Sequence, residues 1–408
     1  MFDLKNENDF TSIREQFPVL KNCVYLISNS LGAVPRKVKA GLEHYYNLWS
    51  KQGVNAWKKE WWDLSKTIST KIQELLKAEK DSITMTSNAT ISHWMALSTQ
   101  FNNKDDKRNR IIMTDLDFPS SIYAVSKIAE SMGWKLEIIK SKKPSYLETE
   151  KITERIDDTT LFVATSHVCF KSSFIQDIQS IAEKASQVGA KTIIDGYHAP
   201  GIIPVHLKKA GIDFYIGGCL KWLCGGPGNA FLYVNPELAE KIQPSLTGWM
   251  AHENPFKFDL DLKYTSGSYR FMSGTPPIAC LYTAAAGLDI IKNIGIKNIR
   301  DKSTSMTQWI INKAKERNFS IHSPLKKELR GGAVSINLPY AFQVKQALDQ
   351  KKILVDFRKG RTDNEDVIRI GPHFYNKKGE VDVLFEQIDD IYSSGYYRKF
   401  SKTISHVT

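Results

Sequence analysis

The sequence has few cysteines and no long apolar stretch. Its five cysteines are an odd number without a CxxC pair, which argues against a disulfide framework or a zinc site and favours a reducing cytoplasm. No run of about 18 apolar residues occurs, so we expect no membrane span. The first nine residues lack the apolar core of a signal peptide. We therefore expect a cytoplasmic protein without a bound metal.

Nucleotide and nucleic-acid motifs are also missing. Neither GxGxxG nor GxxxxGK[ST] is present, which leaves dinucleotide and nucleoside triphosphate sites without support. The formal net charge of +12 is spread over short lysine pairs, with no helix-turn-helix or RNA-reading motif. Solvated lysines that weakly attract anionic ligands account for this pattern, and we expect no nucleic-acid partner.

The chain does contain a regular alternation of short apolar runs and helix-type segments. Helix-type segments such as 120–132 and 177–188 separate the runs. This alternation predicts an α/β fold with a mainly parallel, seven-stranded sheet covered on both faces. The runs expected to form strands are Ile83–Thr86, Ile111–Thr114, Leu136–Ile139, Leu161–Thr165, Thr192–Ile194, Phe214–Ile216 and Ala230–Val234.

We expect the 408 residues to form more than one domain. Residues 76–290 would form the large domain, and residues 291–408 a smaller α+β domain with strands at 333–338, 353–357 and 367–370. Residues 1–75 are helical in period from Pro35 onward and have no strand partner of their own. We therefore expect this N-terminal segment to pack with the small domain.

One lysine stands between two apolar strands. Lys221 follows a run that ends in glycines and precedes a Gly-Gly-Pro-Gly turn, so it cannot easily reach bulk water. Asp195 ends an earlier strand, and His198 follows it by three residues. This set suits pyridoxal phosphate (PLP): the lysine would form an imine, and the aspartate would keep the pyridine nitrogen protonated. A surface lysine and an ordinary capping aspartate form the alternative reading.

A phosphate site would complete such a cofactor pocket. The segment 84–93 runs from a strand into a helix and is rich in small and hydroxylated residues. Free N–H groups and the dipole at a helix N-terminus favour an anion, which makes Ala89 and Thr90 the candidate phosphate contacts. The alternative is a plain helix cap.

Seven ordered segments resemble the class V branch of fold-type I PLP enzymes, and within it the kynureninases most closely. The resemblance runs through nearly the whole length of the chain. In chain order the matching segments are Asn29-Ser30-Leu31-Gly32, Phe118-Pro119-Ser120, Asp195-Gly196-Tyr197-His198, Lys221, Gly248-Trp249-Met250-Ala251-His252-Glu253, Gly274-Thr275-Pro276-Pro277 and Ile368–Asn376 with Arg369.

The resemblance implies a role for each match. Phe118 would stack on the cofactor, and His198 would stack on its other face or orient the aspartate. Trp249 would donate to a phosphate oxygen, and the segment of Thr275 would reach the phosphate of the neighbouring subunit in a homodimer with shared active sites. Arg369 would bind the carboxylate of an amino-acid substrate. The expected sets are Lys221, Asp195 and His198 for catalysis; Ala89, Thr90, Phe118, Ser120, Ser121, Asp195, His198, Lys221, Trp249 and Thr275 for the cofactor; and Arg369, Asn29 and Trp57 for the substrate.

Three positions depart from the kynureninase pattern. Leu220 replaces a tyrosine before the lysine, and Ser121 replaces an aspartate after Phe-Pro-Ser. Gly274-Thr275 stands where Asn would precede Pro-Pro, which is closer to class V desulfurases and aminotransferases. A desulfurase would need a mobile cysteine in the C-terminal domain, and none follows Cys280.

The reaction therefore stays open between two enzymes. One is hydrolytic Cβ–Cγ cleavage of kynurenine-type substrates to alanine and anthranilate, for which Tyr197 or Lys171 would have to replace the missing phenol. The other is amino transfer to a 2-oxo acid. A non-catalytic PLP-fold protein is a distant third reading, against which Lys221, Asp195 and Arg369 argue.

Overall fold

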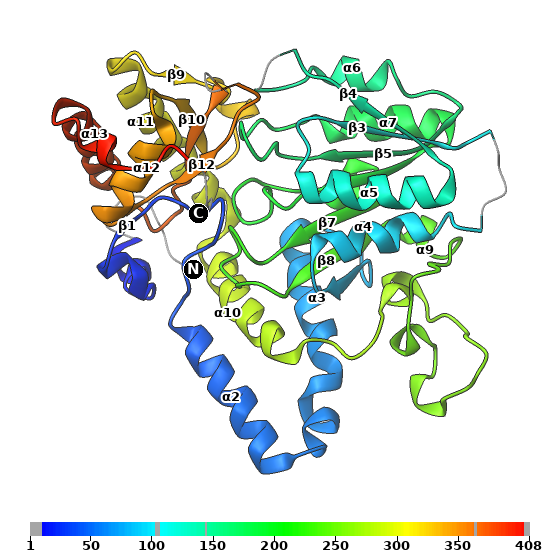
Figure 1. The fold of residues 1–408 in the computed structure, drawn as a ribbon. Helices are drawn as coiled ribbons and strands as arrows, with labels where there is room; N and C mark the ends of the chain where they lie inside the picture. Colours follow the sequence, from blue (N-terminus) through cyan, green and yellow to red (C-terminus); the bar gives the residue numbers. More distant parts are fainter. Residues whose placement is uncertain (1–9, 103–106, 143–144, 363–364, 404–408) are drawn as a thin grey trace.

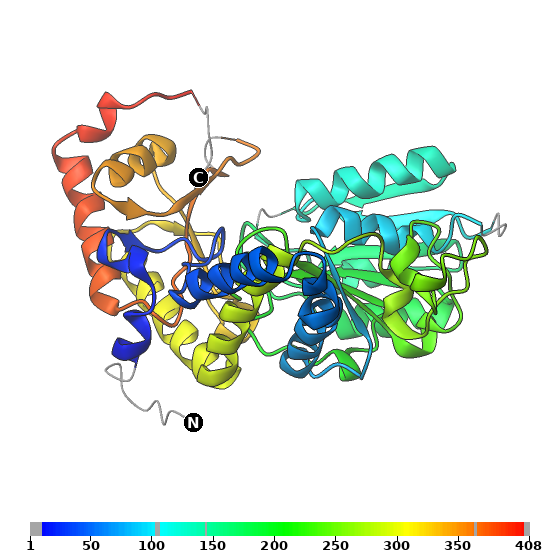
Figure 2. The same ribbon diagram turned by 90° about the horizontal axis from the view of Figure 1, so that it is seen from below.

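The computed structural model describes residues 10–102, 107–142, 145–362 and 365–403. The first nine residues, on which the signal-peptide expectation rests, lie outside this part of the chain. A large α/β body stands beside a smaller one, and the long helix α2 (Lys37–Gln52) projects below both (Figure 1). The two bodies also lie side by side when the molecule is seen from below (Figure 2).

A seven-stranded sheet forms the centre of the large body, with the order β2-β8-β7-β6-β5-β3-β4. β8 is antiparallel to both of its neighbours, and the other adjacent strands are parallel. All seven predicted strands are confirmed to within two residues of their expected limits. They are β2 (Ile83–Thr86), β3 (Arg110–Thr114), β4 (Lys135–Ile139), β5 (Thr160–Ser166), β6 (Lys191–Asp195), β7 (Phe214–Gly218) and β8 (Ala230–Val234).

Helices cover both faces of this sheet because its strands are apolar on both sides. In β7, Phe214 and Ile216 pack into the core under α4 and α5, whereas Tyr215 between them packs into the core formed with α3, α7 and α10. Among the described residues no single helix has the length and apolarity of a membrane span. The helices α10 (Ile278–Ile294) and α11 (Ile296–Glu316) have that length and apolarity only when they are taken together, and the pair is bent by 83°. The helices of this body are α3 (Trp62–Leu76), α4 (Ala89–Ser98), α5 (Pro119–Met132), α6 (Thr149–Thr153), α7 (Ile178–Val188), α8 (Leu207–Ala210), α9 (Pro236–Ala239) and α10 (Ile278–Ile294).

The N-terminal helices do not pack where we expected. α2 (Lys37–Gln52) lies along α10, and α3 packs against β2 and α10, after a π-helical turn at Trp57–Trp61. The expectation that residues 1–75 pack with the small domain is therefore wrong for these helices. The reason is the apolar face of α3, which is fully buried in the core of the large body. Of the described N-terminal residues, Val24–Tyr25 (β1) pair with the small-domain strand β11 (Ile353–Leu354), and Ile27 forms a bridge with Gly371.

The small domain is an antiparallel sheet of order β12-β13-β10-β9 covered by α11, α12 and α13. Its apolar core also takes in Leu26 from the N-terminal segment. The domain comprises α11 (Ile296–Glu316), β9 (Ser320–Ile321), β10 (Val334–Asn337), α12 (Ala341–Gln350), β11 (Ile353–Leu354), β12 (Asp356–Arg358), β13 (Val367–Ile370) and α13 (Lys378–Ser393).

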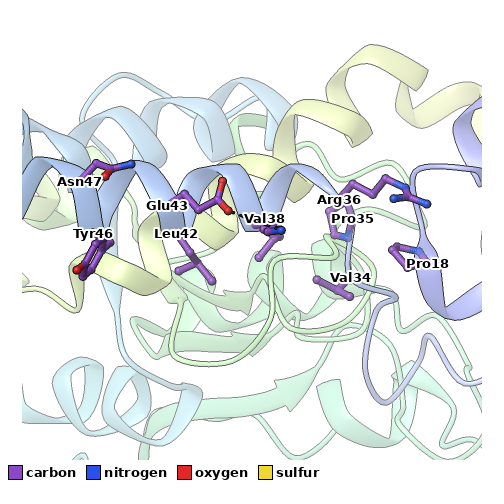
Figure 3. Close-up of a pocket in the computed structure, with 10 residues that line it drawn as sticks. Pro18, Val34, Pro35, Arg36, Val38, Leu42, Glu43, Tyr46 and Asn47 are labelled. Atoms are coloured by element: carbon purple, nitrogen blue, oxygen red, sulfur yellow. Dashed lines mark ion pairs between the residues drawn. The ribbon is translucent and has the colours of Figure 1, made fainter.

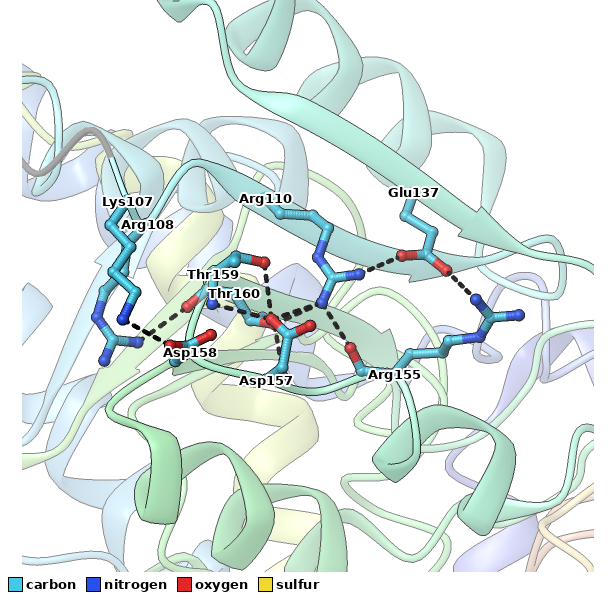
Figure 4. A network of polar contacts seen from close by, with 9 residues as sticks. All are labelled: Lys107, Arg108, Arg110, Glu137, Arg155, Asp157, Asp158, Thr159 and Thr160. Carbon is cyan, nitrogen blue, oxygen red and sulfur yellow. Dashed lines mark hydrogen bonds and ion pairs between the residues drawn. The ribbon is translucent and has the colours of Figure 1, made fainter.

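Charged residues tie the amino ends of three neighbouring strands together (Figure 4). Arg110, the first residue of β3, forms ion pairs with Glu137 of β4 and Asp157 before β5, both at 2.8 Å. A further bond of 2.7 Å joins its guanidinium to the carbonyl of Arg155. This network lies at the amino ends of the strands, so it supports the sheet at the edge opposite to their carboxyl ends.

Candidate active site

The carboxyl ends of five strands surround one cavity of about 310 Å³. Ligands of open α/β sheets bind at this edge, because the strands end there and the loops that follow carry polar side chains. Nine of the thirteen residues expected at the site line it, as does Leu220. The lining consists of Ser30, Asn88, Ala89, Thr90, Phe118, Ser120, Ser121, Ser166, Val168, Phe170, Asp195, Tyr197, His198, Leu220, Lys221, Arg358 and Arg369.

Lys221 follows β7 and carries the reactive nitrogen of the cavity. Its Nζ lies 2.6 Å from Nε2 of His198 and 5.7 Å from the ring centre of Phe118. The turn that holds it packs closely on the N-terminal loop: the Gly32 N–H donates to the carbonyl of Leu220 at 3.0 Å. Burial, and then the positive charge of Arg369, lower the pKa of Lys221 to about 7. The amine is therefore substantially neutral near pH 7, as a nucleophile or base must be.

Asp195 ends β6 and is 8% exposed. One carboxylate oxygen accepts a hydrogen bond from the Ser121 hydroxyl at 2.8 Å, and the other accepts from the backbone N–H of Tyr197 at 3.0 Å. These two donors orient the carboxylate. Ser121, which stands where kynureninases carry an aspartate, therefore contributes a neutral hydroxyl that positions Asp195.

Two helix N-termini reach the cavity. α4 begins at Ala89 after Asn88, whose side chain caps the helix by accepting from the Ile91 N–H at 3.0 Å. α5 begins at Pro119, next to Ser120. First-turn N–H groups have no partner within their own helix, so two dipoles and the Thr90 and Ser120 hydroxyls favour an anion here.

Aromatic rings lie on both sides of the lysine. Phe118 is 39% exposed and meets Phe170 edge to face, with ring centres 5.2 Å apart. His198 is buried, and burial followed by the charge of Lys221 holds its pKa well below the usual value. His198 is therefore neutral near pH 7 and offers a flat face or a hydrogen bond.

Arg358 and Arg369 both pair with one buried carboxylate, Asp356, at the wall of the cavity formed by the small domain. Asp356 pairs with Arg369 across the β12–β13 register and with Arg358 at 3.2 Å. Arg369 also donates to the carbonyl of Phe170, and burial lowers its pKa to about 10. The Nε of Arg358 is buried without a partner among the described residues. This wall thus carries two guanidinium groups against one carboxylate.

Four expected residues do not line the cavity. Trp57 stacks on Trp62 at 4.3 Å, because the π-helical turn brings these tryptophans together away from the sheet; its placement in the pocket was wrong for the single chain. Asn29 is buried beside Ser30, and its amide atoms have no partner among the described residues. Trp249 is half-buried against Trp62, and Thr275 is exposed.

Sequence reasoning missed several lining residues. Ser166 ends β5 and Val168 and Phe170 follow it, and their only signal was the end of a predicted strand. Arg358 alternates with Asp356 on one strand, a spacing that places both on the same face. Of the two candidates for a replacement phenol or acid, Tyr197 lines the cavity, whereas Lys171 bonds to the carbonyl of Lys359 outside it.

The residues present fit pyridoxal phosphate. The N-termini of α4 and α5 with their hydroxyls offer the donor set of a phosphate site. Asp195 is a buried, oriented carboxylate that can hold a pyridine nitrogen protonated, and the pair of Phe118 and His198 can enclose a flat ring. Lys221 supplies an amine of lowered pKa for covalent attachment. The unpartnered amide of Asn29 is a further polar group beside the cavity.

Comparison with known proteins agrees with this geometry. The family described as Aminotransferase class-V matches residues 24–384. The chain is 28% identical over 370 residues to a kynureninase of Pseudomonas fluorescens, covering 88% of this chain and 87% of that protein. It is 30% identical over 386 residues to the uncharacterized aminotransferase YcbU of Bacillus subtilis, covering 92% and 96%. A cysteine desulfurase of Thermococcus onnurineus has the same fold, with a TM-score of 0.81 at 22% identity, covering 94% of this chain and 98% of that one.

Proposed function

Because this chain belongs to the class V aminotransferase family and is a PLP-dependent enzyme, we propose that it hydrolyses the Cβ–Cγ bond of kynurenine-type amino acids. The products would be alanine and anthranilate. The observation that carries this proposal is the composition of the cavity wall: the rings of Phe118 and Tyr197 lie 5.7 Å and 5.0 Å from the Lys221 amine, and the Phe170 ring lies 5.9 Å from the Arg369 guanidinium. A substrate with an α-carboxylate at one end and an aryl ketone at the other matches that wall. The similarity of this chain to kynureninases supports the same proposal.

Three residues of the chain have separate roles in this reaction. Bound PLP supplies an electron-withdrawing ring that stabilises negative charge at the substrate's Cα. Asp195 holds a proton at the pyridine nitrogen, which strengthens that withdrawal. Lys221, with a pKa of about 7, takes the α proton as a base. Arg369 orients the α-carboxylate so that the α proton faces the lysine.

The test is to incubate the holoenzyme with kynurenine and 3-hydroxykynurenine and to quantify both products. Formation of the anthranilate and alanine in equal amounts, without any 2-oxo acid, is the expected result. A set of aliphatic and aromatic amino acids serves as the comparison. Turnover of those amino acids without any release of anthranilate from kynurenine would contradict the proposal.

A class V aminotransferase is the second candidate, and Leu220 is the observation that favours it. An isobutyl side chain lies in the cavity where kynureninases carry a phenol, and it cannot move a proton. The Bacillus relative named as an aminotransferase is 30% identical. Amino transfer needs no group beyond Lys221 to return a proton. Turnover that depends on a 2-oxo acid and leaves the side chain of the amino acid intact would identify this reaction.

Replacing Arg369 by alanine tests the carboxylate site. We expect kcat/KM to fall by the equivalent of roughly 2–4 kcal/mol, because a buried charge pair with the substrate is lost. Selectivity for the amino acid over the corresponding amine without a carboxylate should fall with it. Arg317→Ala is the matched control, since that arginine forms a similar pair with Asp389 on the surface of the small domain. Unchanged selectivity in Arg369→Ala would show that another group binds the carboxylate.

A homodimer accounts for an apolar surface that the single chain leaves open. Leu42 and Tyr46 of α2, with Val34 from the segment before it, line a groove of about 840 Å³ (Figure 3). Their side chains are 52%, 39% and 67% exposed. Contiguous apolar surface of this kind marks an interaction site. We propose that a second copy covers it and brings its Trp249 and Thr275 to the phosphate end of the first copy's cavity.

Subunit complementation tests this arrangement. We expect Lys221→Ala and Thr275→Glu to be nearly inactive when each is purified alone. After unfolding and refolding of a 1:1 mixture, roughly a quarter of the wild-type activity should return, because each mixed dimer carries one site with both native residues. Light scattering supplies the oligomeric state. A fully active monomer, or a mixture without recovered activity, would contradict shared sites.

A further inference from the structure

Tyr197 brings a phenol into the cavity beside the lysine. The Lys221 Nζ lies 5.0 Å from the centre of the Tyr197 ring. The backbone N–H of Tyr197 donates to Asp195, so its main chain is held by the same carboxylate that would hold the pyridine nitrogen. A substrate whose α carbon lies within reach of Lys221 therefore lies beside this phenol.

Gly218 leaves the space that this ring occupies. A Cβ atom at position 218 would lie 2.3 Å from Cζ of Tyr197 and 2.4 Å from its hydroxyl oxygen. The backbone of Gly218 does not have a positive φ, so its conformation is open to other residues. The space needed by the phenol, and not the backbone conformation, therefore requires a glycine at position 218. Residues 197 and 218 are thus coupled by their packing.

The Tyr197 hydroxyl also differs from the buried hydroxyls around it. Tyr215 bonds to His167 at 2.9 Å and Tyr375 to Ser28 at 2.6 Å. Among the described residues, the hydroxyl of Tyr197 has no such partner. Burial, and the nearby charge of Asp195, raise its pKa above the ordinary value. The phenol therefore stays protonated near pH 7 and has a proton to give.

Among the described lining residues at this end of the cavity, Lys221 has to return the α proton to Cα, and the other neighbours cannot supply a second proton. Leu220 has no polar atom. His198 has a pKa held well below its usual value and contacts the lysine through Nε2. Of the described lining residues near Lys221, Tyr197 is thus the one that can act as an acid beside the neutral amine of Lys221.

We propose that Tyr197 is the proton donor to the substrate's side chain, an inference that rests on the Cβ–Cγ hydrolysis proposed above. A water molecule adds its oxygen to the γ carbonyl carbon, and the Cβ–Cγ bond then breaks. The electron pair of that bond stays on Cβ, which receives the proton of the Tyr197 hydroxyl. As the bond breaks, one hydroxyl of the hydrated carbonyl loses its proton, this proton restores the phenol, and the second product leaves as the carboxylic acid. Tyr197 thus performs the proton transfer that Leu220 cannot.

Tyr197→Phe isolates the hydroxyl, because it keeps the ring and its packing on Gly218. With holoenzyme and kynurenine we expect kcat to fall by about 10²-fold or more, while KM changes by less than roughly threefold. Exchange of the substrate's α proton with D2O should continue, because Lys221 is intact. A purely structural role would slow exchange and cleavage together. Tyr215→Phe is the control and should leave both rates unchanged, since that ring lies outside the cavity.

A second variant tests the pairing of the two positions. Gly218→Ala displaces the phenol, so it should lower kcat in the wild-type background by about as much as Tyr197→Phe. In a Tyr197→Ala background the same substitution should cause no further loss. Failure of wild type to release anthranilate would overturn the hydrolysis and this inference together. Anthranilate release by Tyr197→Phe at the wild-type rate would overturn the inference alone.

Discussion

Lys221→Ala should abolish covalent attachment of the cofactor and lower turnover by more than about 10³-fold. The side chain supplies both the amine that joins PLP and the base for the α proton, and within the described residues no second amine lines the cavity. Reduction of the wild-type holoenzyme with borohydride, followed by peptide mapping, should place the cofactor on Nζ of Lys221. The variant should give no cofactor-bearing peptide under the same treatment.

Lys171→Ala is the matched control for this experiment. Burial lowers the pKa of Lys171 too, but its Nζ bonds to a backbone carbonyl outside the cavity. It should therefore keep the attachment on Lys221. A labelled peptide from another part of the chain, or an imine that persists in Lys221→Ala, would overturn the assignment of the lysine and with it the proposed chemistry.

Asp195→Asn should bind the cofactor and lose most turnover. The amide is nearly the same size as the carboxylate and can keep a contact with the Ser121 hydroxyl, but it carries no charge to hold the pyridine nitrogen protonated. We expect kcat to fall by on the order of 10²–10³-fold, as when one preorganised electrostatic group is removed. Cofactor content and kcat are measured on the same preparation.

Asp213→Asn controls for the loss of a half-buried carboxylate near the other end of the same strand. Asp213 accepts from the Thr192 N–H at 2.8 Å, at the start of β6, and does not line the cavity. Its variant should lose stability without a comparable loss of kcat. Equal losses of kcat in the two variants would show that Asp195 acts through the fold and not through the cofactor.

The positions of the strands and of the reactive lysine follow from local sequence. A strand buried on both faces needs consecutive apolar residues, and the run Leu161–Thr165, which lies within a strand buried along its whole length, is visible without any tertiary information. Polar residues that follow such runs come together at one edge of a parallel sheet. The local sequence thus predicted the α/β fold and brought Lys221 and Asp195 into one site, to which the resemblance to class V enzymes added Phe118.

The direction of β8 and the packing of α2 and α3 were decided only in three dimensions. Strand periodicity is the same for parallel and antiparallel neighbours. An amphipathic helix such as α3 specifies that one face is buried and leaves open which partner buries it. The surface of β2 and α10, which is assembled from distant parts of the chain, settled that choice.

The polar wall of the cavity shows the same division. Asp356 and Arg358 have an ordinary surface-strand spacing, and their meeting with Arg369 depends on the register between β12 and β13. The position of the Tyr197 phenol in the cavity depends on Gly218, which is the last residue of a different strand, β7. Sequence by itself determined which residues could do chemistry, because short sequence patterns indicate whether a residue is buried and which residues next to it are polar. The tertiary structure decided which of them face one another, because register and close packing join residues that are far apart in the chain.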